Sequence, residues 1–309
     1  MKRLLVGYKA ADLDPRLLEG DVTCHVLDIY HAHAIERTHP GARVVCSAHL
    51  PPGPWDEIAF KTGPSLMAGE LSLDLLQEIH LLRPRSFRLD YVGRERDRND
   101  LLDKIRDDPD RVRNFAARWP ASVPGGPRLT FTSTPGCFCH RRLDEGGLAL
   151  AEVVARELAA PGGCRRPRLL DMGCGCGLVG LLVASVTDGV RLTLVDSHAR
   201  AVEAARLNAD AFGADAEVIL ADDGIGGRPE LAGTYDVFVG NPPYYSDYRI
   251  AEVFLGTARQ ALRPGGVCYT VVKNPAGLEP VQRRFFPEVE VMRRRGYAVL
   301  KSVRRENMV

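Results

Sequence analysis

Short apolar runs alternate with stretches of helical spacing through the second half of the chain. The runs predict strands at residues 168–171, 191–196, 217–221, 235–240, 266–273 and 297–303. Helical periodicity follows Gly177 and continues at 199–211 and 250–262. Strands that alternate with helices in this way indicate a doubly wound α/β fold with a mostly parallel sheet, which binds ligands at the carboxyl ends of its strands.

A looser form of the same alternation occupies the first part of the chain. Strands are predicted at 43–47, 57–60 and 87–92, and a helix at 65–82, which Pro84 prevents from continuing. Residues 97–118 are highly charged, but acids nearly cancel bases, which favours a solvated helix over an RNA-facing arm. This part has neither a glycine-rich strand-to-helix loop nor an Asn-Pro-Pro pattern, so we assign it no chemistry.

A proline- and glycine-rich segment at 122–127, SVPGGP, predicts the boundary between two domains. We expect an N-terminal α/β domain over residues 1–121 and a second domain over residues 127–309, in which a further strand at 129–132 comes first. At 309 residues the chain is long enough for each domain to bury its own core.

Composition narrows the class of protein. The chain has 41 Lys plus Arg against 40 Asp plus Glu, so any nucleic-acid site must be a local patch. The cysteine pairs at 137/139 and 174/176 are spaced C-x-C, and the histidines at 31, 33 and 39 lack accompanying ligands, so we predict no metal site and interpret the histidines as loop residues. No apolar run reaches the roughly 18 residues of a membrane span, and the basic start is too short for a signal peptide. We expect a soluble, cytoplasmic protein.

Glycines follow the strand at 168–171 and predict a nucleotide-binding loop. Gly173, Gly175 and Gly177 remove side chains where backbone N–H groups can approach a ligand at a helix N-terminus. The segment also fits the dinucleotide fingerprint G-x-G-x-x-G, and a tight turn without a ligand is a further alternative. Asp171, just before the glycines, favours the ammonium end of an amino-acid-bearing cofactor. Asp196 ends the next strand, where an acid reaches ribose hydroxyls in either class.

Two later strand ends add candidates. Asp222 follows the third strand, where its carboxylate either accepts from an adenine amino group or serves as a plain turn residue. The fourth strand ends in Asn241-Pro242-Pro243-Tyr244. The lone pair of an exocyclic amine is delocalised into its ring, so transfer to that nitrogen needs acceptors that localise the lone pair. The Asn241 side-chain oxygen and the Pro242 carbonyl are such acceptors, the prolines stiffen the loop, and Tyr244 offers a face for stacking.

These residues resemble a known family. The Asn-Pro-Pro-Tyr pattern, the glycine loop and TPGCFCHRRLDEGG at 134–147 are similar to class I S-adenosylmethionine-dependent methyltransferases, and most similar to the ribosomal RNA guanine-N2 methyltransferases of the RsmC/RlmG type. The resemblance implies a seven-stranded Rossmann-like sheet and an N-terminal domain that is a degenerate duplicate of it, with 56–61 as a decayed fourth-strand region. It implies that the N-terminal domain is non-catalytic and either recognises RNA or serves as a scaffold.

The resemblance also implies roles for the candidate residues. Asn241, Pro242, Pro243 and Tyr244 match the catalytic loop. Cofactor-binding positions are matched by Asp171, Gly173, Gly175, Gly177, Asp196 and Asp222. The expected activity is methylation of guanine N2 in ribosomal RNA, with the small subunit favoured, on naked RNA or on an assembled subunit.

Three alternatives remain open. The amine acceptor could be adenine N6 or a protein glutamine amide, because both present a planar NH₂ to the same loop. The glycine loop also fits an NAD-dependent dehydrogenase. Finally, the chain could be a non-catalytic RNA-binding assembly factor that retains the fold.

Overall fold

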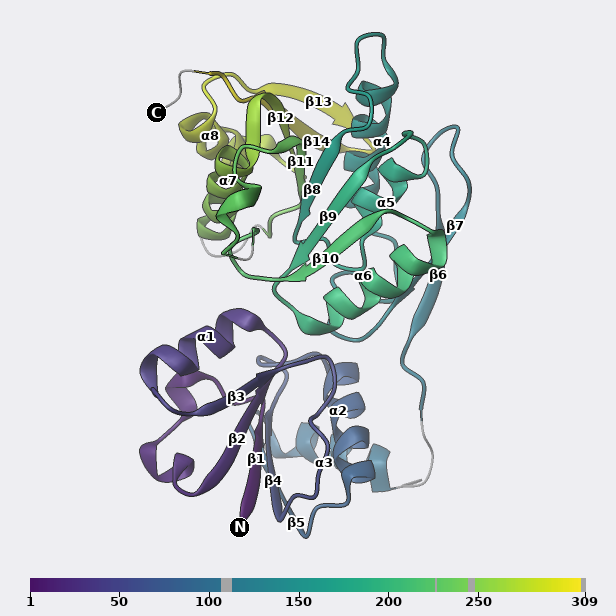
Figure 1. Cartoon of the computed structure of the whole chain (residues 1–309). Helices are drawn as coiled ribbons and strands as arrows, with labels where there is room; N and C mark the ends of the chain where they lie inside the picture. Colours follow the sequence, from purple (N-terminus) through teal and green to yellow (C-terminus); the bar gives the residue numbers. More distant parts are fainter. Residues whose placement is uncertain (107–112, 226, 244–247, 307–309) are drawn as a thin grey trace. The chain divides into compact units, whose positions relative to one another are not determined.

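Two compact units make up the chain in a computed structural model, which describes residues 1–106, 113–225, 227–243 and 248–306 (Figure 1). The first unit comprises Met1–Ala116 together with two short later segments, Thr134–Gly136 and His198–Arg200. The second comprises Ala117–Ser133, Cys137–Ser197 and Ala201–Val309. Among the described residues, no helix is long and apolar enough to cross a membrane.

The first unit contains a five-stranded parallel sheet in the order β3-β2-β1-β4-β5. Its strands are β1 (Lys2–Val6), β2 (Asp21–Val26), β3 (Arg43–Cys46), β4 (Glu57–Thr62) and β5 (Ser86–Tyr91). Its helices are α1 (Ile29–Thr38), α2 (Gly69–Leu82) and α3 (Glu95–Arg106), with short 3-10 turns η1 (Ala10–Asp12) and η2 (Pro15–Leu18). Alternate strand residues form two cores, one with α1 and one with α2 and α3.

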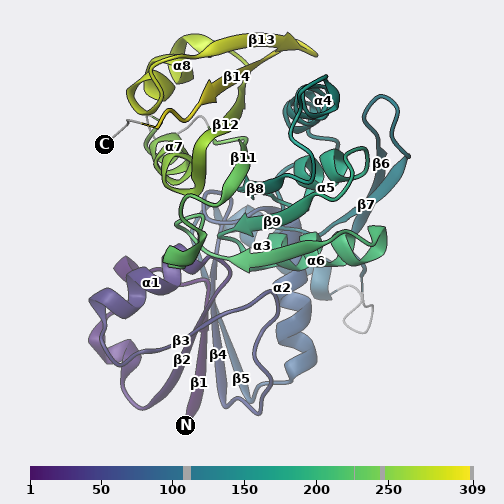
Figure 2. The ribbon, with the colours of Figure 1, turned by 45° about the horizontal axis from the view of Figure 1, so that its top comes forward.

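The second unit contains a seven-stranded sheet in the order β10-β9-β8-β11-β12-β14-β13, in which β14 runs antiparallel to both of its neighbours, β12 and β13, and the other pairs are parallel. Its strands are β8 (Arg168–Met172), β9 (Arg191–Asp196), β10 (Ala216–Leu220), β11 (Tyr235–Gly240), β12 (Leu262–Val272), β13 (Glu290–Arg294) and β14 (Tyr297–Val303). A separate hairpin joins β6 (Ala117–Ala121) to β7 (Leu129–Ser133), as Figure 2 shows.

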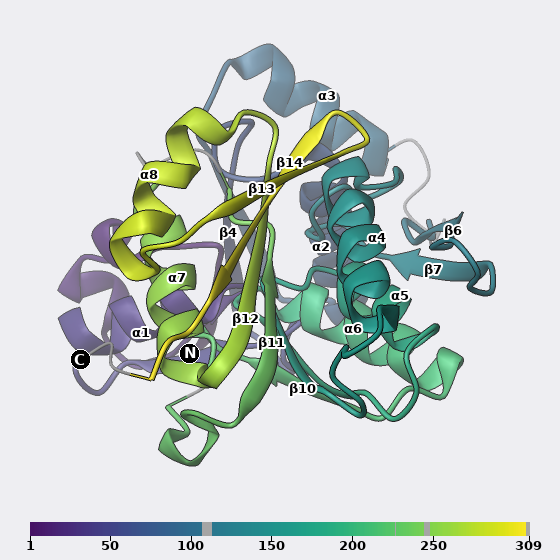
Figure 3. The same cartoon turned by 90° about the horizontal axis from the view of Figure 1, so that it is seen from above.

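Helices cover both faces of this sheet (Figure 3). One core packs α4 (Glu145–Ala159), α5 (Leu178–Ala184) and α6 (Ala199–Phe212) against it, and a second packs α7 (Arg249–Ala261) and α8 (Pro275–Phe285), with the 3-10 turn η3 (Pro229–Leu231) alongside. Because the central strands are buried on both sides, they read as continuous apolar runs. This is the doubly wound, mostly parallel α/β fold that the sequence predicts.

The two sheets repeat one strand order. Across the sheet of the first unit the strands lie in the order 3-2-1-4-5, numbered by their place in the sequence. When β8–β12 of the second unit are numbered one to five, β10-β9-β8-β11-β12 gives the same order. The register also repeats, since Arg3 lies opposite Glu57 and Leu169 lies opposite Val237. This shared arrangement is what a degenerate duplicate is expected to show.

A carboxylate at the start of the fourth strand repeats as well. Asp56 accepts the Lys2 backbone N–H at 2.7 Å, and Asp236 accepts the Arg168 backbone N–H at 2.8 Å. Each carboxylate is also paired with an arginine near the start of the fifth strand, Arg85 at 3.4 Å and Arg263 at 2.6 Å. We call Asp56 and Asp236 the strand-start carboxylates; each ties together three strands at their amino ends.

Several expectations need correction. Residues 122–127 connect β6 to β7 within one hairpin, and the division between the units falls at Ala116, because the antiparallel pairing of these strands draws both into the second unit. His31 and His33 belong to helix α1 and His39 is its C-cap, so they are not loop residues. The strands β1, β2, β6 and β13 were absent from the prediction.

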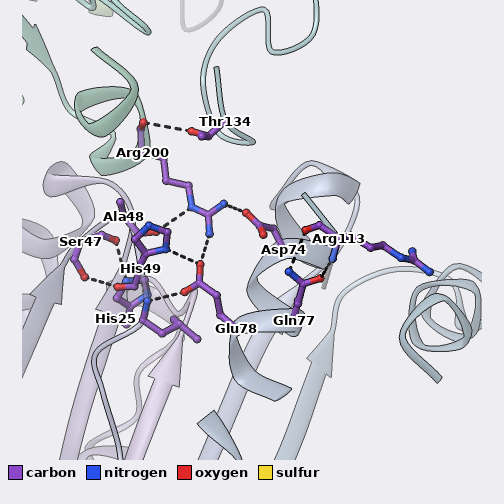
Figure 4. Close-up of polar contacts among 11 residues, drawn as sticks. His25, Ser47, Ala48, His49, Asp74, Gln77, Glu78, Arg113, Thr134 and Arg200 are labelled. Carbon is purple, nitrogen blue, oxygen red and sulfur yellow. Dashed lines mark hydrogen bonds and ion pairs between the residues drawn. The ribbon is translucent and has the colours of Figure 1, made fainter. Parts of the chain in front are cut away.

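A buried arginine joins the segment His198–Arg200 to the rest of the first unit (Figure 4). The Arg200 side chain is only 2% exposed, and its guanidinium donates to the Ala48 carbonyl at 3.0 Å and to Glu78 at 2.9 Å and pairs with Asp74. A buried cation needs such compensation, because removing it from water is costly. Arg200 is therefore held by two carboxylates of α2.

Candidate active site

The candidate residues lie at the carboxyl ends of four adjacent strands. In the order β10-β9-β8-β11, these ends carry Asp222, Asp196, the glycine loop and Asn241. Loops from neighbouring parallel strands emerge at the same edge of a sheet, which is where ligands bind in doubly wound folds. The topology thus brings together the described candidate residues that the sequence singled out; Tyr244 lies outside the described residues.

The glycine loop runs from β8 to α5 in a conformation that side chains disfavour. Gly173, Gly175 and Gly177 have φ values of +67°, +56° and +85°. A Cβ at Gly173 would lie 2.7 Å from the ring of Phe254, and one at Gly177 would lie 2.8 Å from Leu181, whereas one at Gly175 would meet no atom within 4 Å. The loop therefore packs tightly at both ends and is open at its middle, which leaves space for a ligand beside Gly175.

Asp171 lies beneath the loop and is 2% exposed. Its carboxylate accepts the Gly180 backbone N–H at 2.9 Å, which ties β8 to the first turn of α5. Burial raises the pKa of Asp171 to about 7; the Gly180 hydrogen bond opposes this rise and the charge of Asp196 adds to it. A cationic group nearby would favour the ionised form of this carboxyl.

Asp196 holds the middle of the same loop. Its carboxylate accepts the Gly175 backbone N–H at 2.9 Å, and the preceding residue, Val195, accepts the Cys174 N–H at 3.0 Å. Asp196 therefore fixes the backbone of the glycine loop at the carboxyl end of β9.

The turn after β10 is stabilised by the residue that follows the predicted one. Asp223 accepts the backbone N–H groups of Ile225 at 3.2 Å and Gly227 at 2.8 Å. Asp222 is half-buried two residues beyond the strand end. Asp223 therefore stabilises this turn through both hydrogen bonds, and Asp222 takes part in neither of them.

Asn241 follows β11, and its side-chain Nδ2 donates to Asp144 Oδ2 at 2.9 Å. Asp144 lies in the segment 134–147 that carries the family resemblance, but it is not among the predicted site residues. Pro242 is buried and Pro243 half-buried, which supports a stiff loop at this strand end.

Two further side chains support the site and were missed. Phe254 of α7 lies against Gly173 and Gly240, since a Cβ at either would come within 2.8 Å of its ring. Asn208 of α6 donates to the Cys176 carbonyl of the glycine loop at 2.9 Å, and it bonds both backbone groups of Thr132 at 2.8 Å. Neither residue carries a sequence pattern that distinguishes it from a core or surface position.

The cysteines of the site are packing residues. Cys137, Cys174 and Cys176 are each at most 7% exposed and lie in the core of the second unit. Burial raises the pKa of Cys174 and of Cys176, which keeps both as thiols. Within the described residues, no group of three or more His, Cys, Asp or Glu side chains could hold a metal ion.

Comparison with known proteins identifies the family. The model of the methyltransferase small domain matches residues 128–301, more than half of the chain. The chain belongs to the methyltransferase small domain family. The resemblance inferred from the glycine loop and Asn241–Tyr244 is thereby confirmed at the level of the family.

Relatives within this family act on ribosomal RNA according to their names. The chain is 41% identical over 160 residues to ribosomal RNA small subunit methyltransferase C of Pseudomonas aeruginosa. The aligned region covers 49% of this chain and 45% of the relative. The chain is 34% identical over 177 residues to ribosomal RNA large subunit methyltransferase G of Streptomyces coelicolor, covering 55% of this chain and 44% of the relative. The match thus spans about half the length of these curated relatives.

A solved structure shares the fold over almost the whole chain. The Thermus thermophilus 16S rRNA N2 G1207 methyltransferase (RsmC), solved with AdoMet and guanosine, superimposes with a TM-score of 0.80 at 21% identity, covering 99% of this chain and 88% of the other. At this identity the likeness establishes the fold of both units.

Proposed function

We propose that this protein transfers the methyl group of S-adenosylmethionine to the exocyclic N2 amine of a guanine in ribosomal RNA, with the small subunit favoured. The observation that carries the proposal is the placement of Asn241 beside the glycine loop, with its Nδ2 already engaged by Asp144. Its Oδ1 is then the atom of the amide that can accept from an amine. The names of the relatives and the guanosine in the RsmC structure support guanine as the base.

The residues fit the proposed cofactor. The open space at Gly175 accepts a ligand against the loop backbone, and Asp196 supplies carboxylate oxygens for ribose hydroxyls. Asp171 provides a buried carboxyl toward the methionine end, and Asp222 lies where an acceptor for adenine is expected. When bound, S-adenosylmethionine supplies an electrophilic methyl group on a sulfonium.

The chain's own contribution to the chemistry is orientation. Asn241 Oδ1 and the Pro242 carbonyl would accept the two amine N–H groups, which localises the nitrogen lone pair and aims it at the methyl group. A base can enter such a site only when it is unpaired or has left its stack. The reaction is therefore expected on a guanine that is exposed in the RNA or displaced on binding.

Partners and location follow from the proposed substrate. Ribosomal RNA, free or within a subunit, is the macromolecular partner, and the cytoplasm is where that substrate is found. The first unit, which keeps the strand order but has no glycine loop of the β8–α5 kind in its described residues, is proposed to recognise RNA or to serve as a scaffold.

Arginines near the C-terminus are largely engaged in ion pairs and are weak candidates for phosphate contacts. Arg294 and Arg295 both pair with Glu152, whose side chain is 4% exposed. Arg284 pairs with Glu252. These arginines are placed to stabilise the second unit.

The test uses ribosomal RNA from cells that lack this protein, incubated with purified protein and S-adenosylmethionine, and then digested to nucleosides for mass spectrometry. We expect N2-methylguanosine from the wild type. Asn241→Ala should lower the rate by about 10²-fold or more while cofactor affinity changes little, because the lost acceptor acts on the amine. Asp188→Asn, at an exposed position before β9 in the second unit, is the control.

The outcomes separate the alternatives. N6-methyladenine in place of N2-methylguanosine would change the acceptor, and methylation of a protein glutamine would change the class of substrate. Tight binding of NAD without binding of S-adenosylmethionine would support the dehydrogenase alternative, which membership of a methyltransferase family disfavours. No methylation by the purified wild type, together with unchanged methylation of ribosomal RNA in cells that carry Asn241→Ala, would indicate a non-catalytic assembly factor.

A further inference from the structure

We infer that Asp144 is a positioning residue that fixes the orientation of the Asn241 amide. The inference rests on the proposed function, because it assigns the amide oxygen to the substrate amine. It deepens that function by adding a residue 97 positions away in sequence from Asn241.

The geometry gives each oxygen of one carboxylate a separate partner. Asp144 is the N-cap of α4, and its Oδ1 accepts the Gly146 backbone N–H at 3.0 Å. Its Oδ2 accepts from Asn241 Nδ2 at 2.9 Å. The cap contact anchors the carboxylate to a helix whose first two turns are largely buried, so the second oxygen has a defined position for Asn241.

The chemistry of the pair allows one orientation of the amide. An ionised carboxylate only accepts hydrogen bonds, whereas an amide has a donating NH₂ on one side and an accepting oxygen on the other. Asp144 therefore selects the orientation in which Asn241 Oδ1 is left for the amine. In the flipped orientation two oxygens would oppose each other at Asp144, and an N–H would face the N–H groups of the substrate.

Two glycines leave room for this arrangement. A Cβ at Gly147 would lie 2.7 Å from Asp144 Oδ2, the oxygen that Asn241 uses. A Cβ at Gly146 would lie 3.2 Å from the ring of Tyr297. The sequence Asp-Glu-Gly-Gly at the start of α4 therefore suits a helix cap whose second carboxylate oxygen must remain available.

Asp144→Asn tests the inference. Asparagine is as good an N-cap as aspartate, so the fold and cofactor affinity should be retained. The new amide can donate to Asn241 Oδ1 and so stabilise the flipped orientation, which removes the acceptor from the amine. We expect kcat for RNA methylation to fall about 10²-fold, with the dissociation constant of S-adenosylmethionine within about twofold of the wild type.

The exchanged pair Asp144→Asn with Asn241→Asp provides the rescue. The introduced amide can cap α4 and donate to the introduced carboxylate, whose second oxygen is again an acceptor for the amine. We expect kcat of this double variant to be about tenfold or more above that of Asp144→Asn. A purely structural role of Asp144 predicts no such recovery. Asp188→Asn, the same substitution at an exposed position before β9 in the second unit, should keep the wild-type rate.

Each result bears on one claim. Wild-type kcat in Asp144→Asn, or a double variant no faster than Asp144→Asn, would overturn the inference while leaving the proposed function in place. A wild-type protein that methylates no RNA would contradict the proposed function and the inference with it. A product other than N2-methylguanosine that still depends on Asp144 in this way would change the base and retain the positioning role.

Discussion

Asp171 shows how a single residue can oppose stability in order to serve a site. It is buried, and its carboxylate accepts a hydrogen bond from the Gly180 backbone N–H, with no Lys or Arg paired to it among the described residues. Because its pKa in the folded protein is about 7, between about pH 4 and pH 7 the folded protein favours the neutral carboxyl whereas the unfolded chain carries the charged form. Ionising it in the ligand-free protein therefore costs free energy, which an ammonium group would offset.

Asp171→Asn should stabilise the ligand-free protein at neutral pH and weaken cofactor binding. The folded pKa is raised, so the destabilisation by Asp171 grows as pH rises from about 4 to 7 and is constant above that window, by at most about 1.4 kcal/mol per pH unit. The stability difference between variant and wild type should therefore increase from pH 5 to pH 8 in urea unfolding. A difference that does not depend on pH would contradict the assignment.

At the scale of elements, one helix side chain supports two strand ends. Phe254 of α7 lies under the loop after β8 and under the last residue of β11, where Gly173 and Gly240 leave it space. The two glycines differ in backbone conformation, because Gly173 has a φ of +67° and Gly240 has no such positive value. Steric contact is thus the whole reason for glycine at 240 and only part of the reason at 173.

Gly240→Ala should lower stability by about 1–3 kcal/mol, because its Cβ would lie 2.8 Å from the Phe254 ring. Adding Phe254→Leu should recover much of that loss, and the same addition should recover less for Gly173→Ala, whose backbone strain remains. Thermal unfolding of the single and double variants gives the coupling energies. Equal recovery at both positions would contradict this account.

Much of the second unit could be predicted from sequence because its central strands are apolar on both faces. The bounds of β9, β11 and β14 agree with the predicted runs, and the loop glycines stand directly after β8. In the second unit the sequence fails to predict two strands with few buried residues: β13 is a mostly exposed edge strand, EVMRR, and β6 contains Pro120. Burial does not explain the omission of β1 and β2 in the first unit, because most of their residues are buried. The contact of Asp144 with Asn241 depends on how α4 packs on the sheet, which the spacing of residues along the chain does not specify.

On the scale of the whole molecule, the two sheets agree at their amino ends and differ at their carboxyl ends. The hydrogen bond from the Lys2 N–H is the main cause that lowers the pKa of Asp56. Burial tends to raise the pKa of Asp236, but the hydrogen bonds from Arg168 and Arg263, with the charge of Arg263, together lower it. At the other edge, the position of Asn241 is taken in the first sheet by Lys61, which pairs with Asp12 at 2.6 Å. Stabilising contacts were thus kept in both units, while the candidate chemistry is confined to one.

Asp236→Ala should lower the free energy of unfolding by about 1–3 kcal/mol, since its side chain is 15% exposed and the Arg168 N–H loses its acceptor. Asp56→Ala should cause a smaller loss, because that side chain is 32% exposed. Neither variant should change the affinity for S-adenosylmethionine, because Asp236 is at the amino edge of its sheet, opposite the candidate site, and Asp56 belongs to the other unit. Calorimetry and a binding titration check both statements, and a loss of affinity in Asp236→Ala would contradict them.

The buried Arg200 has a consequence for how this protein can be divided. A fragment that begins at Ala117 would contain the complete seven-stranded sheet. It would keep Arg200, in the first turn of α6, but would lack Asp74 and Glu78, the carboxylates that pair with it. Units that are contiguous in space are here interleaved along the chain. A chimaera that takes the first unit from a relative would therefore also have to take residues 198–200 from it. We expect the first unit not to be transferable as one continuous segment.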